Sequence, residues 1–499
     1  MLAHTYGVTH LGLNAQIIDI ETDMSNGLPG FIVVGLASKA VEESKERVRS
    51  ALKNSALNFP PKRITVNLAP ADLPKSGSSF DMGIAVGILV SSGQISMPLN
   101  KPLFYAELAL DGSTRPIPGC LAASQAAAEA GFDEIYVPAQ NAYQAALTQN
   151  ITVYPVKNLE QLYRHLIGEQ PIAPLQSASP KRGETTAEVD FADVYGQQQA
   201  KRAAEIAAAG GHNILLSGPP GSGKTLLAKA IAGILPSLSY HEMIEVTRIH
   251  GLCMDTADNL ISQRPFRAPH HTSSSIALTG GGQWPKPGEI SLAHHGILFL
   301  DELPEFPRHV LEVLRQPLED KTVSIARANA TYRFPANFML VATQNPCPCG
   351  YAGDMLAACQ CSPTQINRYQ HKVSGPLLDR IDIKVHMGRL ETEHLIEQSR
   401  GETSATIATR VEKARNRQRD RQASKHGEVS NSELTNTQVK QHCQLDSQTK
   451  LLATQAISQL KLSARSYMRV LKVSRTIADL AGSSAIQTPH LSEALQYRI

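Results

Sequence analysis

The stretch from Asn213 to Thr225, NILLSGPPGSGKT, most limits what this chain can fold into. Its apolar run, Ile214 to Leu216, predicts a buried strand, and the following LLAKAIAGIL predicts a helix. The glycines between them let backbone N–H groups turn inward around a phosphate, whose charge the helix dipole favours. We expect Lys224 to reach the β- and γ-phosphates of ATP and Thr225 to hold Mg²⁺. The loop that binds the cofactor would consist of Gly218, Pro219, Pro220, Gly221, Ser222, Gly223, Lys224 and Thr225.

A second apolar run, Gly296 to Leu300, ends in two carboxylates, Asp301 and Glu302. On its own such a run is often a strand with a solvated acidic end. Downstream of a complete phosphate loop, it is the strand that carries the metal-binding and water-activating groups of a nucleotide hydrolase. We expect Asp301 to lie near Mg²⁺ and Glu302 to polarise the attacking water.

Composition narrows the class of protein without deciding it. The chain has 499 residues, 42% of them hydrophobic and 19% charged, which is typical of a globular protein with two or three cores. A net charge of +3 permits a nucleic-acid partner but does not demand one. No apolar run is long enough to span a bilayer, and no secretory signal is evident. An odd number of cysteines, seven, favours a reducing cytoplasm over a disulfide framework.

The chain divides into four parts. Residues 1–168 alternate strand-like and helix-like runs, which predicts an α+β domain, and a Pro-, Ser- and Gln-rich linker is expected over 169–189. Residues 190–390 alternate again around the two elements above, as in an α/β fold whose parallel sheet is covered by helices. Residues 391–499 are mostly helical. In the first part, helices are expected over 39–55, 81–92 and 121–130.

Several long stretches are similar to the magnesium-chelatase-like family of AAA+ proteins, and the resemblance covers essentially the whole chain. They include ITVNLAPADLPKSGSSFDMGIAVGIL, DVYGQQQAKRAAEIAAAGGHNILLSGPPGSGKT, PGEISLAHHGILFLDELPEF and YQHKVSGPLLDRIDI. The resemblance implies an AAA+ core with a helical lid, preceded by a domain similar to the proteolytic domain of Lon proteases. The first two elements above are then the Walker A and Walker B motifs.

The similarity to Lon places Ser79, in KSGSSFD, at the position of the Lon nucleophile. The Lon lysine would fall near Leu121, in IPGCLAA, where there is no lysine. A serine without a base is a poor nucleophile at neutral pH. We therefore expect the N-terminal domain to be non-proteolytic and to serve assembly or DNA contact.

The family resemblance also implies roles beyond the Walker motifs. Asn345, after the strand FMLVATQ, would be the sensor that positions the attacking water. Arg380, in LLDRIDI, resembles the finger that AAA+ proteins insert into the ATP site of the neighbouring subunit, with Arg368 as a second candidate. Arg465, in the lid, would contact a phosphate as sensor 2. From spacing alone, each arginine could instead form a surface salt bridge.

The same family resemblance implies that two insertions reach a central pore. The stretch RPFRAPHHTSSSIALTGGGQWPKPGEI carries Lys286 beside Trp284, the only tryptophan, as well as Arg264 and Arg267. The segment VSIARANATYRF predicts a hairpin with Arg327 near its turn. Cations and aromatic rings at a pore suit a phosphate backbone and its bases, so Lys286 and Arg327 are the predicted DNA contacts. The histidine pairs 270/271 and 294/295 are expected to point to opposite faces of a strand and not to share a metal.

Cys347, Cys349, Cys359 and Cys361 lie within one short segment. Paired thiols on a loop suit a structural Zn²⁺ site, although four free thiols on a loop are the alternative. The strongly basic run 410–426 is more typical of a solvated helix face than of a DNA surface.

By resemblance to DNA-processing members of this family, we expect a ring, a hexamer, around single-stranded, forked or branched DNA. It would be an ATP-dependent helicase that promotes branch migration in homologous recombination during natural transformation. The alternative is the ATPase motor of a metal (magnesium) chelatase, although that motor is not expected to carry the long Lon-like domain. An ATP-driven protease is disfavoured by the missing lysine.

Overall fold

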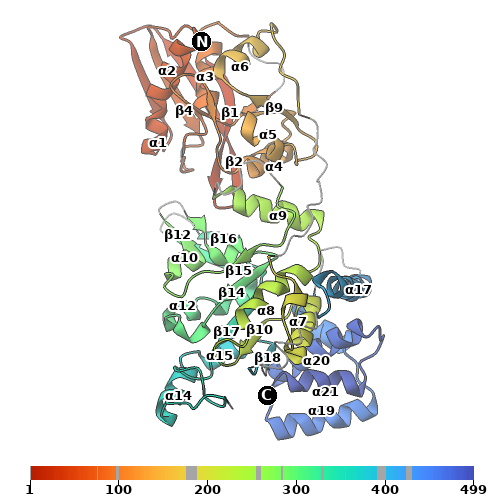
Figure 1. The fold of residues 1–499 in the computed structure, drawn as a ribbon. Helices are drawn as coiled ribbons and strands as arrows, with labels where there is room; N and C mark the ends of the chain where they lie inside the picture. The colour runs from red at the N-terminus through yellow and green to blue at the C-terminus, as the bar shows by residue number, and fades with distance from the viewer. Residues whose placement is uncertain are drawn as a thin grey trace.

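The structure, a computed structural model, describes residues 2–498 except 37, 76, 97–100, 176–187, 254–259, 283–284, 328–330, 355, 390–400 and 423–429. The N-terminal domain lies at one end, the five-stranded motor domain in the middle, and the helical lid beside it (Figure 1). Most of the predicted linker and the predicted boundary between motor and lid fall outside the described residues, as does Trp284.

The N-terminal domain is built on a seven-stranded mixed sheet in the order β3-β4-β2-β1-β5-β8-β9. Helix α3 is apolar around its whole circumference, and all eleven of its residues are buried, which makes it the centre of the domain's core. Its elements are β1 (Ala3–Leu11), β2 (Asn14–Ser25), β3 (Gly30–Val34), α1 (Lys39–Glu42), α2 (Ser44–Asn54), β4 (Arg63–Ala69), α3 (Asp81–Ser91), β5 (Pro102–Phe104), β6 (Glu107–Leu108), β7 (Thr114–Arg115), α4 (Cys120–Glu129), β8 (Glu134–Pro138), α5 (Ala142–Ala145), β9 (Thr152–Val156) and α6 (Leu159–Leu166).

The α+β prediction for this domain is therefore confirmed, except that one predicted helix is two helices in the structure. Residues 39–55 form two helices, α1 and α2, because the chain turns at Glu43 between them. The other two expected helices, α3 and α4, lie within one residue of their predicted ends.

The motor domain contains the predicted parallel sheet, in the order β11-β14-β17-β10-β18. Strand β14, ILFL, is buried at every residue, as expected of a parallel strand covered on both faces. The elements of the sheet and its helices are α7 (Gln198–Gly210), β10 (Ile214–Ser217), α8 (Lys224–Ile231), α9 (Tyr240–Gly251), β11 (Phe266–Arg267), α11 (Glu289–Leu292), β14 (Ile297–Leu300), α12 (Arg308–Glu312), α13 (Arg315–Asp320), β17 (Met339–Gln344), α14 (Pro363–Gln370), α15 (Gly375–Leu378) and β18 (Ile383–His386).

Both insertions form small antiparallel ribbons outside this sheet. The first carries α10 (Ser275–Thr279) and the pair β12 (Gly280–Gly281) and β13 (Lys286–Pro287). The second is the predicted hairpin, β15 (Thr322–Ala326) and β16 (Thr331–Pro335). The lid consists of α17 (Ser404–Gln422), α18 (Asn436–His442), α19 (Ser447–Leu460), α20 (Ala464–Leu480) and α21 (Thr488–Gln496).

The N-terminal domain rests on the motor through the turn between β1 and β2. Arg248, on α9 at the junction in Figure 1, donates to the carbonyl oxygen of Leu13 at 2.6 Å. Gly12 lies directly against the ring of Tyr332 on the hairpin β15–β16. The hairpin predicted to reach the pore therefore contacts the N-terminal domain close to its turn, since Tyr332 is the second residue of β16.

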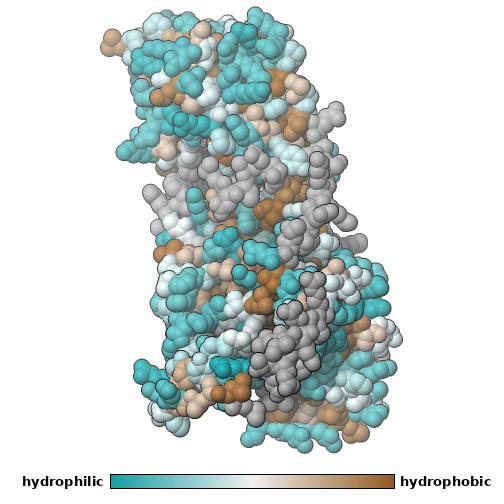
Figure 2. Space-filling model, viewed as in Figure 1, coloured by the Kyte–Doolittle hydropathy of each residue, from teal (hydrophilic) through white to brown (hydrophobic). Residues whose placement is uncertain are grey.

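Hydrophobic residues on the face shown in Figure 2 are dispersed among hydrophilic ones. Among the described helices, a stretch of sufficient length and apolarity to cross a membrane does not occur.

Candidate nucleotide site and its surroundings

The phosphate loop lies at the carboxyl end of β10, between β17 and β18. Gly218 sits so close to the carbonyl oxygen of Met387 that a Cβ there would approach it to 2.1 Å. Gly223 caps α8 with a left-handed φ of 86°, which a residue with a side chain adopts only under strain. The sequence of glycines therefore fits the backbone path that exposes N–H groups to an anion at the start of α8.

Lys224 reaches back across this loop. Its Nζ donates to the carbonyl oxygens of Gly218 and Pro219, each at 2.8 Å. Burial lowers the pKa of Lys224, while Asp301 and Glu302 raise it.

Asp301 and Thr225 come together at the end of β14. The Thr225 hydroxyl donates to the Asp301 carboxylate at 3.2 Å, which places the two predicted Mg²⁺ ligands side by side. Glu302 follows with a left-handed φ of 53° and is exposed toward solvent. Asn345 leaves the neighbouring strand β17 at the same edge of the sheet.

Thr343 is a member of this site that the sequence analysis missed. Its hydroxyl donates to Asp301 and accepts the backbone N–H of Glu302 at 2.9 Å, so it fixes both carboxylate-bearing residues. The signal was its place two residues before Asn345. Gln197 was missed as well, and its amide donates to the carbonyl of Gly388 at 2.6 Å beside the phosphate loop.

Arg380 and Arg465 meet at one carboxylate, that of Glu319. Arg380 pairs with it at 2.6 Å and Arg465 at 2.8 Å. Arg380 is 6% exposed and also donates to the carbonyl of Pro376, whereas the Arg465 side chain is 58% exposed. The structure thus brings the buried Arg380 and the exposed Arg465 together at Glu319, a residue that the sequence analysis did not anticipate. Arg368 lies exposed on α14.

The two insertions also lie side by side. A guanidinium nitrogen of Arg327 would be 3.4 Å from a Cβ placed on Gly281, and Gly281 pairs with Lys286 across β12–β13. Two other cations of the first insertion make hydrogen bonds or ion pairs within the chain. Arg264 bonds the carbonyl of His295 at 2.6 Å, and Arg267 pairs with Glu289 at 2.6 Å.

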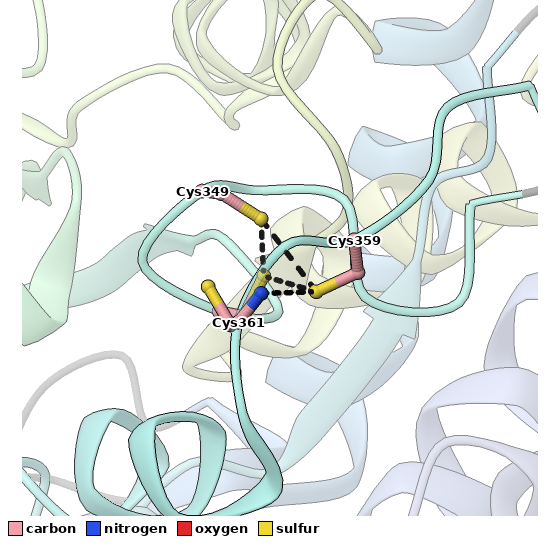
Figure 3. Close-up of side chains that lie close together, drawn as sticks. Cys349, Cys359 and Cys361 are labelled. Carbon is pink, nitrogen blue, oxygen red and sulfur yellow. Dashed lines mark hydrogen bonds between the residues drawn. The ribbon is translucent and has the colours of Figure 1, made fainter.

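The four predicted cysteines converge. Their sulfur atoms all lie within 4.8 Å of one another, with Cys347 3.3 Å from Cys349 and 3.7 Å from Cys359. A tetrahedral zinc–thiolate site with Zn–S bonds of about 2.3 Å has sulfur–sulfur edges of roughly 3.8 Å. In Figure 3, Cys349 and Cys359 turn their sulfur atoms toward the same small volume. The donor set and spacing fit Zn²⁺.

The expectation for the pair His294 and His295 was wrong. The two residues precede β14 in a turn, where His295 has a left-handed φ of 56°, so both rings face Glu245. His294 Nδ1 accepts the backbone N–H of Asn337 at 3.0 Å, which leaves the hydrogen on Nε2, the atom nearest Glu245. Nε2 therefore donates and has no lone pair for a metal. Hydrogen bonds from both histidines hold the pKa of Glu245 below its usual value.

Ser79 borders a cavity of about 1210 Å³ between the N-terminal domain and the two insertions. Its hydroxyl donates to the carbonyl of Val8 at 3.3 Å. Leu121 is buried in α4 and offers no base. Lys75, four residues before Ser79, is fully buried and donates to the carbonyl of Pro70. The described hydrogen bond of the Ser79 hydroxyl is thus to a backbone carbonyl, and the absence of proteolytic activity stays a prediction.

A parallel sheet with a glycine loop at its carboxyl edge, paired acidic residues at the end of a second strand of that sheet and a helical lid define an AAA+ ATPase. Three family descriptions match the chain. They are magnesium chelatase subunit ChlI over residues 190–395, subunit ChlI of Mg-chelatase over 20–141, and the ChlI C-terminal part over 401–498.

Individual relatives make the family more specific. The chain is 46% identical over 507 residues to competence protein ComM of Haemophilus influenzae, and the aligned region covers 100% of this chain and 97% of that protein. It is 44% identical over 497 residues to protein YifB of Salmonella typhimurium, covering 98% and 95%. The 38 kDa magnesium-chelatase subunit of Cereibacter sphaeroides is 26% identical over 31% of this chain and 52% of its own length. The chain belongs to the ComM/YifB family of magnesium-chelatase-like AAA+ proteins.

Proposed function

We propose that this chain is an ATP-driven DNA motor that acts as a hexameric ring and promotes branch migration during DNA uptake. ATP and Mg²⁺ would bind at Lys224, Thr225 and Asp301, with Glu302 and Asn345 directing the attacking water. Full-length similarity to a competence protein supports a role in taking up or integrating DNA.

The observation that carries the proposal is the placement of Arg327 beside the ribbon that holds Lys286. Both are exposed cations on ribbons that project from the ATPase sheet, and neither contacts the phosphate loop. Cations at this position suit the repeating phosphates of a DNA strand, single-stranded, forked or branched. In a ring they would face the central pore.

The first prediction tests whether Lys286 and Arg327 contact DNA. In the double variant Arg327→Ala, Lys286→Ala, basal ATP hydrolysis should stay within about twofold, since surface substitutions away from the site change little. Affinity for forked DNA should fall, and the log–log salt slope should drop by roughly 0.7–0.9 for each lost phosphate contact. Strand displacement and DNA-stimulated hydrolysis should fall together.

The control removes two exposed cations of the lid, Lys440→Ala with Lys450→Ala. Its salt slope and unwinding should match the unaltered protein. A double pore variant with an unchanged slope would contradict these contacts. If the unaltered protein binds no DNA at low salt and its hydrolysis ignores DNA, the motor has another substrate, and a metal-chelatase role becomes the better reading.

We further propose that Cys347, Cys349, Cys359 and Cys361 bind Zn²⁺. The role of the metal would be structural, because four thiolate ligands leave no open coordination position. The second prediction is about one zinc per chain by elemental mass spectrometry of protein prepared without chelator. Cys359→Ser should lower that content strongly, whereas Cys443→Ser, which replaces a buried cysteine of the lid, should not. Folded, active protein without metal would leave the four thiols without this role.

A further inference from the structure

The loop that carries the four thiols, residues 345–361, has little core of its own. It forms no regular helix or strand over its described residues, and Leu356 on it is 70% exposed. Cys347 is buried, and the backbone N–H of Ala352 donates to its sulfur atom at 3.3 Å. The shape of this loop therefore depends largely on what holds the sulfur atoms together.

This loop presses directly on the phosphate loop. Gly350 lies so close to Pro220 that a Cβ on Gly350 would be 2.5 Å from the Pro220 Cδ. Pro220 is one of the residues that shape the phosphate-binding turn. The thiol loop and the phosphate loop are thus in direct contact at Gly350 and Pro220.

A second route joins the same two places. Arg389 pairs with Asp354 of the thiol loop at 3.2 Å, and its guanidinium lies 5.1 Å from the centre of the Tyr351 ring. Arg389 follows Met387 and Gly388 along the chain. The carbonyl of Met387 abuts Gly218, and that of Gly388 is bonded by Gln197. Gly218 at the start of the phosphate loop therefore contacts a segment that pairs with the thiol loop, and Pro220 contacts the thiol loop itself.

We infer that the four-thiol metal site braces the phosphate loop, so that metal occupancy controls nucleotide affinity. This inference rests on the metal site proposed above and adds a regulatory role to it. When the metal is bound, the thiol loop keeps Pro220 and the 387–389 segment in place. When it is lost, the loop relaxes and the backbone N–H groups no longer converge on the phosphates.

Two glycines of the thiol loop allow a matched test. Gly350 and Gly353 have similar left-handed φ angles, 86° and 80°. A Cβ on Gly350 would strike Pro220, whereas a Cβ on Gly353 would meet nothing within 4 Å. Gly350→Ala and Gly353→Ala therefore impose comparable backbone strain, and both keep the four thiols. Only the first disturbs the contact with the phosphate loop.

The readouts are zinc content and the Kd of a fluorescent ATP analogue with Mg²⁺. Gly350→Ala should raise the Kd about tenfold, as overpacking of a tight contact does, whereas Gly353→Ala should stay within about twofold. Both variants should retain zinc. Stripping the unaltered full chain with a zinc-selective chelator should raise the Kd similarly, and adding Zn²⁺ back should restore it.

The possible failures are distinguishable. Unaltered protein without zinc would overturn the metal site itself. Zinc-containing protein whose Kd is unchanged by the chelator, or equal Kd values for the two glycine variants, would overturn the brace and leave the metal site standing. Thermal unfolding of each variant checks that both are folded, and Cys443→Ser serves as a thiol control distant from the loop.

Discussion

Two pockets of this chain place a chemically capable residue beside a glycine-containing loop, the nucleotide site around Lys224 and the N-terminal pocket around Ser79. In the first, the hydroxyls of Thr225 and Thr343 both donate to the carboxylate of Asp301. In the second, the Ser79 hydroxyl donates to a backbone carbonyl, and a buried leucine stands where a base is required.

The difference shows what makes a residue reactive. Lys224 and Lys75 are both buried lysines whose Nζ donates to backbone carbonyls. Lys224 lies in the phosphate loop, where burial lowers its pKa and the two carboxylates Asp301 and Glu302 offset part of that lowering. The hydroxyl of Ser79 has only a carbonyl acceptor among its described contacts, and a carbonyl takes no proton. Partner groups, rather than residue type, separate the two pockets.

The largest effect is expected at the complete site. Lys224→Ala should abolish nucleotide binding and hydrolysis, because the cation that meets the phosphates is lost. Glu302→Gln keeps that cation, so it should bind ATP normally and hydrolyse it about 10²–10⁴-fold more slowly. Radiolabelled ATP binding and phosphate release measure the two steps separately. Hydrolysis by Glu302→Gln near the unaltered rate would remove Glu302 from its role.

The next effect concerns whether the nucleotide site is complete within one chain. Arg380→Ala should still bind ATP but hydrolyse it roughly 10³–10⁵-fold more slowly, since a finger stabilises the transition state. If Arg380 acts on the neighbouring subunit, mixing this variant with Lys224→Ala creates some sites with both groups intact and restores part of the rate.

Two controls belong to that experiment. Co-purification through different tags must show that the variants assemble together, and thermal unfolding must show that loss of the Arg380–Glu319 pair has not unfolded the chain. Co-assembled subunits without recovery would place Arg380 in its own subunit's site or in a structural role.

The smallest effect is expected at Ser79. Ser79→Ala should leave ATP hydrolysis within about twofold and lower the free energy of unfolding by ~1 kcal/mol, the worth of one hydrogen bond. Neither the unaltered protein nor the variant should degrade an unfolded substrate in the presence of ATP. ATP-dependent cleavage that disappears in Ser79→Ala would show that Ser79 is a reactive nucleophile and would contradict the contrast between the two pockets.

Motifs contained in a short run of sequence were predictable. The phosphate loop, the strand ending in Asp301 and Glu302, and the hairpin with Arg327 all depend on backbone conformation set by neighbouring residues. Their positions in the structure agree with the prediction. The four cysteines also belong to this group, because they form two closely spaced pairs in one short segment, and the structure brings their sulfur atoms together.

Contacts between distant parts of the chain were beyond the sequence pattern. The alternation rule failed for His294 and His295 because one left-handed residue in a turn redirects the second ring. Glu319 became the shared partner of Arg380 and Arg465 only when α13 and α20 were brought together by packing. Thr343 looked like one more strand residue until β14 and β17 paired side by side.

The sequence by itself indicated the phosphate loop, the acidic strand and the candidate zinc ligands, because those depend on residue types at fixed short spacings, and its resemblance to a known family indicated the class of protein. Tertiary structure alone decided that the thiol loop lies against Pro220, that two insertions stand together, and that the N-terminal domain touches the hairpin at Tyr332. Such contacts depend on how sheets and helices pack in three dimensions. A spacing along the chain does not encode the distance between two elements that fold toward each other from far apart.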